Sequence, residues 1–276
     1  MEGAGDSGGS ASESQLESWI EEQDRLKKKL IMYDDFPWKI SSSSPSMDHS
    51  DSDKLKYIGG VDMSFSKEDS SVACACLVVL ELPSLRVVYH DFSLLHLRVP
   101  YVPGFLAFRE APVLLQLLDK MQKEQNPFYP QVLIVDGNGI LHPRGFGLAC
   151  HLGVLAHLPT IGVGKNLHHV DGLKQSEVRQ LLQLKENQDE QVINLVGNSG
   201  FTWGVGIRPT LSCLKPIYVS VGHRISLETA VKIVMMTCKY RVPEPIRQAD
   251  MRSREYLQEH QMKVLEEHDL PDQPEH

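Results

Sequence analysis

The sequence predicts an α/β protein with a mixed sheet that begins as an antiparallel meander of three strands, continues with parallel strands and is flanked by helices. Three strand-like segments follow one another directly between residues 57 and 95. The apolar runs after them alternate with amphipathic helical patterns, which is typical of parallel pairing. At 276 residues and 41% hydrophobic composition, the chain can bury one sizeable core, and its length favours a single domain with tails.

The segments before the meander indicate an acidic N-terminal tail over residues 1–53. Residues 1–13 consist largely of Gly, Ser and acidic side chains and hold too little apolar surface to fold. Residues 14–32 repeat apolar side chains at helical spacing, so we expect an amphipathic helix that lies on the body. The serine-rich stretch 41–53 predicts a mobile loop.

The folded domain is expected over residues 54–260, with an acidic, disordered C-terminal tail over residues 261–276. Its meander strands are predicted over 57–65, 71–81 and 85–95. Next come a helix over 104–123, a buried strand over 131–135, a helix over 142–157 and a buried strand over 160–163. Weaker strands over 192–196, 202–207 and 216–221 precede two closing helices over 226–240 and 245–261. This order is that of an RNase H-like sheet, although other α/β proteins can share it.

The charge is concentrated at the two ends of the chain. The net charge is −8, of which residues 1–53 contribute −7 and residues 251–276 contribute −4, so the middle carries +3. The body can therefore approach a polyanion such as nucleic acid.

The five cysteines form no CxxC pair, and the sequence shows neither a secretory signal nor the ~18 apolar residues that a membrane helix needs. We expect an intracellular protein that does not cross a membrane.

Two aspartates occupy unusual places in buried strands. Asp62 lies inside the strand 57–65, and Asp136 directly follows the apolar run 132–135. A carboxylate in such a place is unfavourable unless it meets a cation or hydrogen-bond donors. Asp136 alone could equally cap a turn, but two carboxylates on neighbouring strands would place hard oxygen ligands together, as Mg²⁺ prefers.

Four other polar residues are ambiguous when each is taken alone. Glu110 in the helix after the meander and Asp250 in the last helix are typical solvated helix residues. Lys165 follows the strand 160–163, where an ammonium could face a phosphate or simply meet solvent. His223 suits either a packing role or a phosphate contact, and no His or Cys spacing indicates a zinc site.

The loop Pro100–Gly104 presents Tyr101 between two prolines. Such an aromatic can wedge into a base stack or cover an emptied base position, although the loop taken alone favours a turn with a packed tyrosine. Several glycines follow Asp136 without the spacing of a phosphate-binding loop. Their backbone allows close approach to a flat ligand. They are Gly137, Gly139, Gly145 and Gly147.

Six ordered motifs together resemble the endonuclease V family, over almost the whole stretch from Tyr57 to Arg254. They are Gly59-Gly-Val-Asp-Met-Ser-Phe65, Pro100-Tyr-Val-Pro-Gly-Phe-Leu-Ala-Phe-Arg-Glu110, Asp136-Gly-Asn-Gly-Ile-Leu-His-Pro-Arg-Gly-Phe-Gly147, Gly162-Val-Gly-Lys165, Ser220-Val-Gly-His-Arg224 and Pro243-Glu-Pro-Ile-Arg-Gln-Ala-Asp250. Six motifs of this length in one order make a chance match very improbable. The resemblance implies an RNase H-like fold and makes residues 54–260 the catalytic domain.

The resemblance also implies roles for individual residues. Asp62 and Asp136 would be the metal ligands, Glu110 would complete the acidic site, and Lys165 would serve near the scissile phosphate. Asp250 takes the last catalytic place, where the bacterial pattern usually has a histidine, so its exact role is open. Tyr101 would be the wedge within its loop, and further residues would bind the substrate or line the pocket for a flipped hypoxanthine. These are Pro100, Val102, Pro103, Gly104, Leu106, Gly137, Gly139 and Gly147, with His223 as a further contact.

The implied activity is a Mg²⁺-dependent endonuclease, with Mn²⁺ as a substitute, that cuts the second phosphodiester 3′ to an inosine and leaves a 3′-hydroxyl and a 5′-phosphate. Asp250 and the long acidic ends resemble vertebrate members, which favours inosine in single-stranded RNA over deoxyinosine in DNA. We expect a monomer whose partner is nucleic acid, located in the cytoplasm and the nucleus or nucleolus.

Three other functions compete with this interpretation. A catalytically dead nucleic-acid-binding relative would lack one of the carboxylates, and all are present. A different RNase H-like nuclease would keep the acids without the Pro-Tyr-Val-Pro loop and the glycines. A small-molecule α/β enzyme would use the glycines as a cradle, but it would leave the acids on two strands unexplained.

Overall fold

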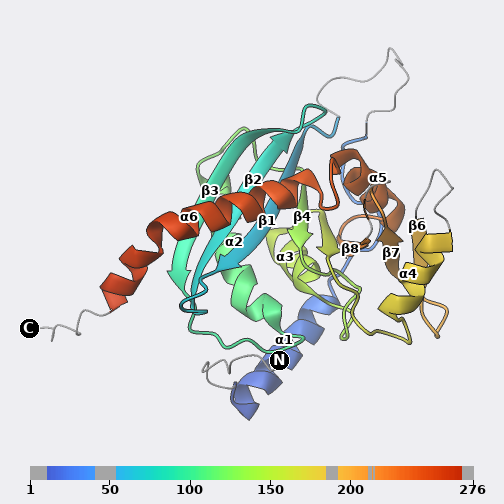
Figure 1. Cartoon of the computed structure of the whole chain (residues 1–276), viewed down its shortest axis with the longest axis horizontal. Helices are drawn as coiled ribbons and strands as arrows, with labels where there is room; N and C mark the ends of the chain where they lie inside the picture. Colours follow the sequence, from blue (N-terminus) through green and yellow to red (C-terminus); the bar gives the residue numbers. More distant parts are fainter. Residues whose placement is uncertain (1–10, 41–53, 185–191, 211–212, 214, 269–276) are drawn as a thin grey trace, which may run out of the picture.

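An eight-stranded mixed sheet forms the centre of the protein, with the strand order β3-β2-β1-β4-β5-β8-β7-β6 (Figure 1). The computed structural model describes residues 11–40, 54–184, 192–210, 213 and 215–268, with backbone alone for residues 184 and 261–268. The predicted α/β class, a mixed sheet flanked by helices, is confirmed. The predicted loop over 41–53, residues 1–10 and residues 269–276 lie outside the described residues.

The meander forms one side of the sheet and is confirmed as antiparallel. It consists of β1 (Tyr57–Phe65), β2 (Val72–Glu81) and β3 (Arg86–His96). Nine of the ten residues of β2 are buried, because helices cover both of its faces. Its odd-numbered residues, such as Val79, pack with the helix that follows the meander, and its even-numbered residues, such as Val78, pack with the last helix.

The other side of the sheet is reached by two parallel steps, as predicted. Strand β4 (Val132–Asp136) pairs in parallel with β1, and β5 (Thr160–Gly164) pairs in parallel with β4. The last three strands then join antiparallel, as β8 (Ile217–His223), β7 (Thr202–Ile207) and β6 (Val192–Val196). Because parallel neighbours end at the same edge, β1, β4 and β5 bring their last residues together.

Helices cover both faces of this sheet. On one face lie α2 (Leu106–Lys123) and α3 (Leu148–Ala156). On the other, α6 (Glu244–His268) crosses β1, β2 and β3, and α5 (Leu227–Thr237) packs beside β8 (Figure 1). Helix α6 extends beyond residue 261, where the sequence analysis ends it, since neither proline nor glycine interrupts the chain before Pro271. Among the described residues, no helix is both long and apolar enough to cross a membrane.

The N-terminal helix α1 (Glu13–Lys27) packs on the body, as predicted for residues 14–32. Ser12 caps it by accepting from the backbone N–H of Gln15. Its side chain Leu26 is fully buried in the main core. Helix α1, which the sequence analysis places within the N-terminal tail, therefore packs against the folded body.

Two helices differ from the sequence expectation. The helix predicted over 142–157 begins only at Leu148, because Gly145 adopts a positive φ of 65° and residues 137–147 form a loop instead. Helix α4 (Gln175–Leu184) was not predicted. Its segment is mostly polar, and only Val178 and Leu182 enter a small core with Tyr218.

Candidate active site

Sheet register places Asp62 beside Asp136. Val61 of β1 pairs with Val135 of β4 in parallel, so the next residue of each strand is an aspartate at the same level. Both side chains lie on the sheet face that α6 covers. This arrangement confirms that the two strand aspartates are neighbours, as the sequence analysis expects.

Helix α6 brings Asp250 to the same point. A Cβ atom at Gly60 would lie only 2.4 Å from the carbonyl oxygen of Pro245, so the glycine allows the start of α6 to lie directly on β1. Farther along, the hydroxyls of Ser64 and Ser253 are hydrogen-bonded at 2.6 Å. Between these two anchors, the carboxyl group of Asp250 is in hydrogen-bonding contact with that of Asp62.

Two basic side chains face the three carboxylates. The ammonium of Lys165, directly after β5, donates to Oδ2 of Asp136. Nη2 of Arg254 lies 2.6 Å from Oδ1 of Asp250, one turn along α6. The ends of β4 and β5 therefore position Asp136 and Lys165, and one face of α6 positions Asp250 and Arg254.

The close approach of the carboxylates changes their protonation. Burial raises the pKa of Asp62 well above its usual range, and the nearby Asp136 and Asp250 raise it further. Burial lowers the pKa of Lys165, but contact with Asp136 and the fields of Asp62 and Asp250 outweigh this effect, so its pKa is raised. The ammonium therefore stays charged, while the carboxylates favour a proton or a cation among them.

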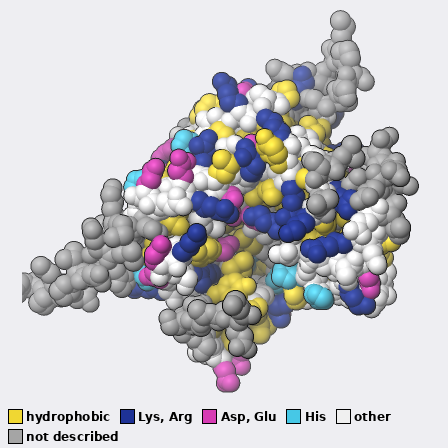
Figure 2. Space-filling view, viewed as in Figure 1, with side chains coloured by type: hydrophobic (Ala, Val, Ile, Leu, Met, Phe, Trp, Pro, Cys, Tyr) yellow, Lys and Arg dark blue, Asp and Glu magenta, His cyan; other side chains and the backbone are white. Residues whose placement is uncertain are grey.

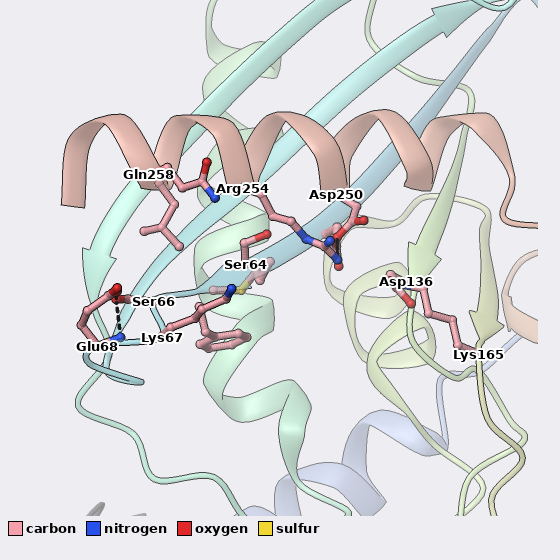
Figure 3. A pocket seen from close by; sticks show the side chains of 13 residues that line it. Ser64, Ser66, Lys67, Glu68, Asp136, Lys165, Asp250, Arg254 and Gln258 are labelled. Atoms are coloured by element: carbon pink, nitrogen blue, oxygen red, sulfur yellow. Dashed lines mark hydrogen bonds and ion pairs between the residues drawn. The ribbon is translucent and has the colours of Figure 1, made fainter.

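These residues line a cleft of about 670 Å³ (Figure 3). In Figure 3, Asp250 and Arg254 point down from α6, while Asp136 and Lys165 come from the strand ends. On the same face of the molecule, Lys and Arg side chains gather around the central acidic ones (Figure 2). The full lining is Asp62, Met63, Ser64, Phe65, Ser66, Lys67, Glu68, Asp136, Lys165, Asp250, Arg254, Leu257 and Gln258.

Glu110 lies in a neighbouring pocket rather than in the cleft. This pocket, of about 320 Å³, is lined by Phe65, Ser70, Tyr101, Leu106, Arg109 and Glu110, and Phe65 lines both cavities. Burial raises the pKa of Glu110 to about 8, and the nearby charge of Asp136 contributes. Glu110, the fifth residue of α2, is therefore close enough to Asp136 for the aspartate charge to raise its pKa.

The predicted base-binding residues divide into open and packed positions. Tyr101 is 56% exposed, so it is not a packed turn residue, and a Cβ at Gly104 would meet nothing within 4 Å. In contrast, a Cβ at Gly139 would lie 1.9 Å from Val221 O, and one at Gly147 would lie 2.3 Å from Asn138 O. These two glycines are required by close backbone packing.

Gly137 is also in contact with protein, since a Cβ there would lie 3.3 Å from Leu148. Pro100, Val102 and Pro103 flank Tyr101 in the exposed loop. Leu106 begins α2 and lines the same pocket as Tyr101 and Glu110.

The structure does not bring His223 to the cleft. It pairs with Thr160 at the opposite end of β5 from Lys165, is 3% exposed, and its Nδ1 accepts from the backbone N–H of Ile31 at 3.3 Å. Burial lowers its pKa to about 4. His223 is therefore a neutral packing residue, the first of the two roles that the sequence left open.

Several cleft residues were not identified from the sequence. Ser64 lies two residues after Asp62, hence on the same strand face, and Arg254 lies four residues after Asp250, hence on the same helix face. These spacings could have indicated both. Lys67 and Gln258 carried no comparable signal.

The arrangement suits chemistry at a phosphate. Asp62 and Asp136 offer adjacent carboxylate oxygens, the ligand type that Mg²⁺ prefers, and Mg²⁺ typically uses one or two carboxylates together with substrate phosphate. In the described part of the chain, no three or more His, Cys, Asp and Glu side chains are placed to hold a metal ion together, so a cation here would need ligands besides these two carboxylates. Lys165 and Arg254 add positive charge for a polyanion.

Comparisons with known proteins agree on one family. The family model described as Endonuclease V matches residues 39–251. Endonuclease V of Mus musculus is 48% identical over 89% of this chain and 70% of its own length, and that of Homo sapiens is 44% identical over 90% and 86%. A crystal structure of the human protein matches with a TM-score of 0.80 at 44% identity, covering 89% of this chain and 99% of that one.

A second solved relative carries a nucleic acid. It is endonuclease V of Ciona intestinalis, in complex with a DNA that contains an inosine followed by a ribo-adenosine. It matches with a TM-score of 0.79 at 36% identity, covering 90% of this chain and 99% of that one.

Proposed function

This chain belongs to the endonuclease V family of nucleases, and on that premise we propose that it hydrolyses the second phosphodiester 3′ to an inosine, preferentially in single-stranded RNA. The products are a 3′-hydroxyl and a 5′-phosphate. The observation that carries the proposal is the meeting of Asp62, Asp136 and Asp250 in one cleft, beside a pocket that presents Tyr101.

The carboxylate cluster fits a divalent cation. Asp62 and Asp250 are in contact and Asp62 has a raised pKa, so the site favours neutralisation by a proton or a metal ion. We propose that Asp62 and Asp136 hold Mg²⁺, with Mn²⁺ as a substitute. When bound, the ion would supply an activated water and would neutralise charge at the phosphate.

The surrounding residues would orient the substrate and handle protons. Lys165 can donate to a phosphate oxygen from its place beside Asp136, and its raised pKa keeps it charged for this purpose. Glu110, with its pKa raised to about 8, can hold or release a proton near neutral pH. Asp250, which contacts Asp62 and pairs with Arg254, can accept a hydrogen bond from the attacking water.

The second pocket supports base recognition. Tyr101 is exposed on a loop braced by two prolines, as a residue that fills an emptied base position must be. Hypoxanthine lacks the exocyclic amine of guanine, so a tight pocket beside Leu106 can exclude guanine by sterics and by leaving that amine without a partner.

Two observations support RNA as the preferred substrate. Asp250 replaces the histidine of the bacterial pattern, as in vertebrate-like members. The Ciona relative was solved with a ribonucleotide directly after the inosine, where a protein can contact a 2′-hydroxyl.

The test is cleavage of four matched single-stranded oligonucleotides, RNA and DNA, each with one inosine or one guanosine, in Mg²⁺ and in chelator. We expect cutting of inosine RNA alone, lost in chelator, with the product ends mapped one nucleotide beyond the inosine. Equal cutting of inosine DNA would instead support a deoxyinosine repair endonuclease. Binding without metal-dependent cutting of either strand would support a non-catalytic inosine-binding relative.

A further inference from the structure

The N-terminal helix α1 contacts both the Tyr101 loop, which lines the proposed base pocket, and the glycine loop 137–147, through one buried side chain. Gln23 is 1% exposed, and its Nε2 donates to the carbonyl oxygen of Phe146 at 2.8 Å and to that of Gly104 at 3.3 Å. Its Oε1 accepts from Nε of Arg144. The two carbonyl partners lie 81 and 123 residues away in sequence.

Neighbouring contacts hold the same two loops to α1. The Lys27 ammonium donates to the carbonyl oxygen of Arg144 at 2.7 Å, and Arg144 Nη2 donates to Asp24 at 2.9 Å. The Arg144 guanidinium lies 5.6 Å from the ring centre of Phe105, which directly follows Gly104. Helix α1 therefore bridges the end of the Tyr101 loop and the glycine loop 144–147.

A glutamine is specifically suited to this bridge. Its amide offers two donors and an acceptor, and the two loop carbonyls and the Arg144 guanidinium use both kinds. An apolar side chain of the same length would leave two buried carbonyls without this donor. A glutamate would keep the acceptor but would direct a carboxylate at both carbonyls.

We propose that Gln23 is a positioning residue for base recognition. By tying Gly104 to the buried Phe146, it fixes the short stretch between Tyr101 and Leu106, two residues that line the proposed base pocket, and therefore the fit of that pocket to hypoxanthine. This inference rests on the proposed function and extends it: the part of the chain before the nuclease motifs would determine selectivity without touching the reacting phosphate.

The first test compares kcat and KM of the full-length chain on inosine and guanosine RNA. The variants are Gln23→Met, which keeps length but loses all three hydrogen bonds, and Gln23→Glu, which loses only the donor. Glu21→Ala, exposed on the same helix, is the matched control. We expect the inosine-to-guanosine ratio of kcat/KM to narrow by roughly tenfold in Gln23→Met, mainly through KM, since a buried hydrogen bond is worth up to about that factor. An unchanged ratio in both Gln23 variants would overturn the inference.

The second test does not depend on cleavage. Amide hydrogen exchange of segments 100–106 and 139–147 should accelerate in Gln23→Met and stay unchanged in Glu21→Ala, with both proteins folded by circular dichroism. Unchanged exchange in both segments would refute the bridge, whatever the cleavage result. If exchange accelerates but the wild type cuts no inosine strand, the proposed function fails, and the role in base recognition fails with it.

Discussion

At the scale of single residues, the site consists of charged side chains in positions that would be unfavourable for each one alone, and their mutual contacts offset this cost. Asp62 lies half-buried among acids, Lys165 is held by those acids, and Glu110 has a pKa raised to about 8. The sequence could predict Asp62 and Asp136 because a carboxylate inside or after a buried strand is conspicuous. It could not predict Gln23, since its partners are backbone carbonyls that only tertiary folding brings near.

His223 gives a prediction about acid stability. Its pKa is about 4 in the folded protein, mainly because of burial, against 6.5 ordinarily, so it stabilises the fold above pH 6.5 and this contribution is lost as the pH falls towards 4. In His223→Asn, whose amide oxygen can still accept from Ile31, the loss of unfolding free energy between pH 7.5 and pH 5 should be smaller by about 2 kcal/mol. Urea unfolding at the two pH values measures it. An equal acid loss in both proteins would show that folding leaves the pKa of His223 at its ordinary value.

At the scale of elements, strand ends and close backbone contacts position the chemistry. Apolar runs bounded by turn signals predicted the strands almost to the residue, since burial on both faces leaves a clear signal in strands such as β2 and β4. The loop 137–147 and helix α4 were not predicted, because loop geometry depends on glycine torsions and α4 buries only a narrow stripe.

Arg241 connects two of these elements. Its Nη2 donates to the carbonyl oxygens of Lys165 at 2.8 Å and Pro216 at 2.9 Å, so it fixes the segment that carries the Lys165 ammonium. Arg241→Lys keeps the charge but loses the planar guanidinium that donates to both carbonyl oxygens. We expect kcat to fall roughly tenfold with little change in KM. Lys239→Ala, at an exposed neighbouring position, is the control for a substitution near this site that leaves the Arg241 contacts in place. A wild-type kcat in Arg241→Lys would mean that Lys165 is positioned without this contact.

Alanine substitutions at Gly139 and Gly164 should reduce the free energy of unfolding by different amounts. Gly139→Ala would force a Cβ against the Val221 carbonyl, 1.9 Å away, and backbone cannot move aside cheaply, so we expect a loss of at least about 3 kcal/mol. In Gly164→Ala the Cβ would meet the end of the Asn138 side chain at 2.8 Å and the backbone only at 3.2 Å, at Asn166 O, so this variant should lose about 1 kcal/mol. Chemical denaturation compares the two, and equal losses would contradict the packing argument.

At the scale of the whole molecule, the net charge is acidic although the surface around the proposed active site is rich in basic side chains. The −8 total comes from the ends of the chain, while Lys and Arg surround the acidic cleft on the face that α6 crosses (Figure 2). The affinity for inosine RNA should therefore fall steeply with salt, by roughly tenfold or more between 50 and 200 mM, because phosphate contacts release counterions. A salt-independent Kd would argue that the strand is not held through its phosphates.

The central claim is that the carboxylate cluster cuts the strand and other residues bind it. The most direct measurement is paired: the cleavage rate and the Kd of one inosine RNA for the wild type and for Asp62→Asn. The variant keeps the shape of the side chain and relieves repulsion among Asp62, Asp136 and Asp250, so it should be at least as stable as the wild type. We expect the rate to fall by about three orders of magnitude or more while Kd stays within about threefold. Cutting by Asp62→Asn at the wild-type rate would contradict the assignment of this cluster as the catalytic centre.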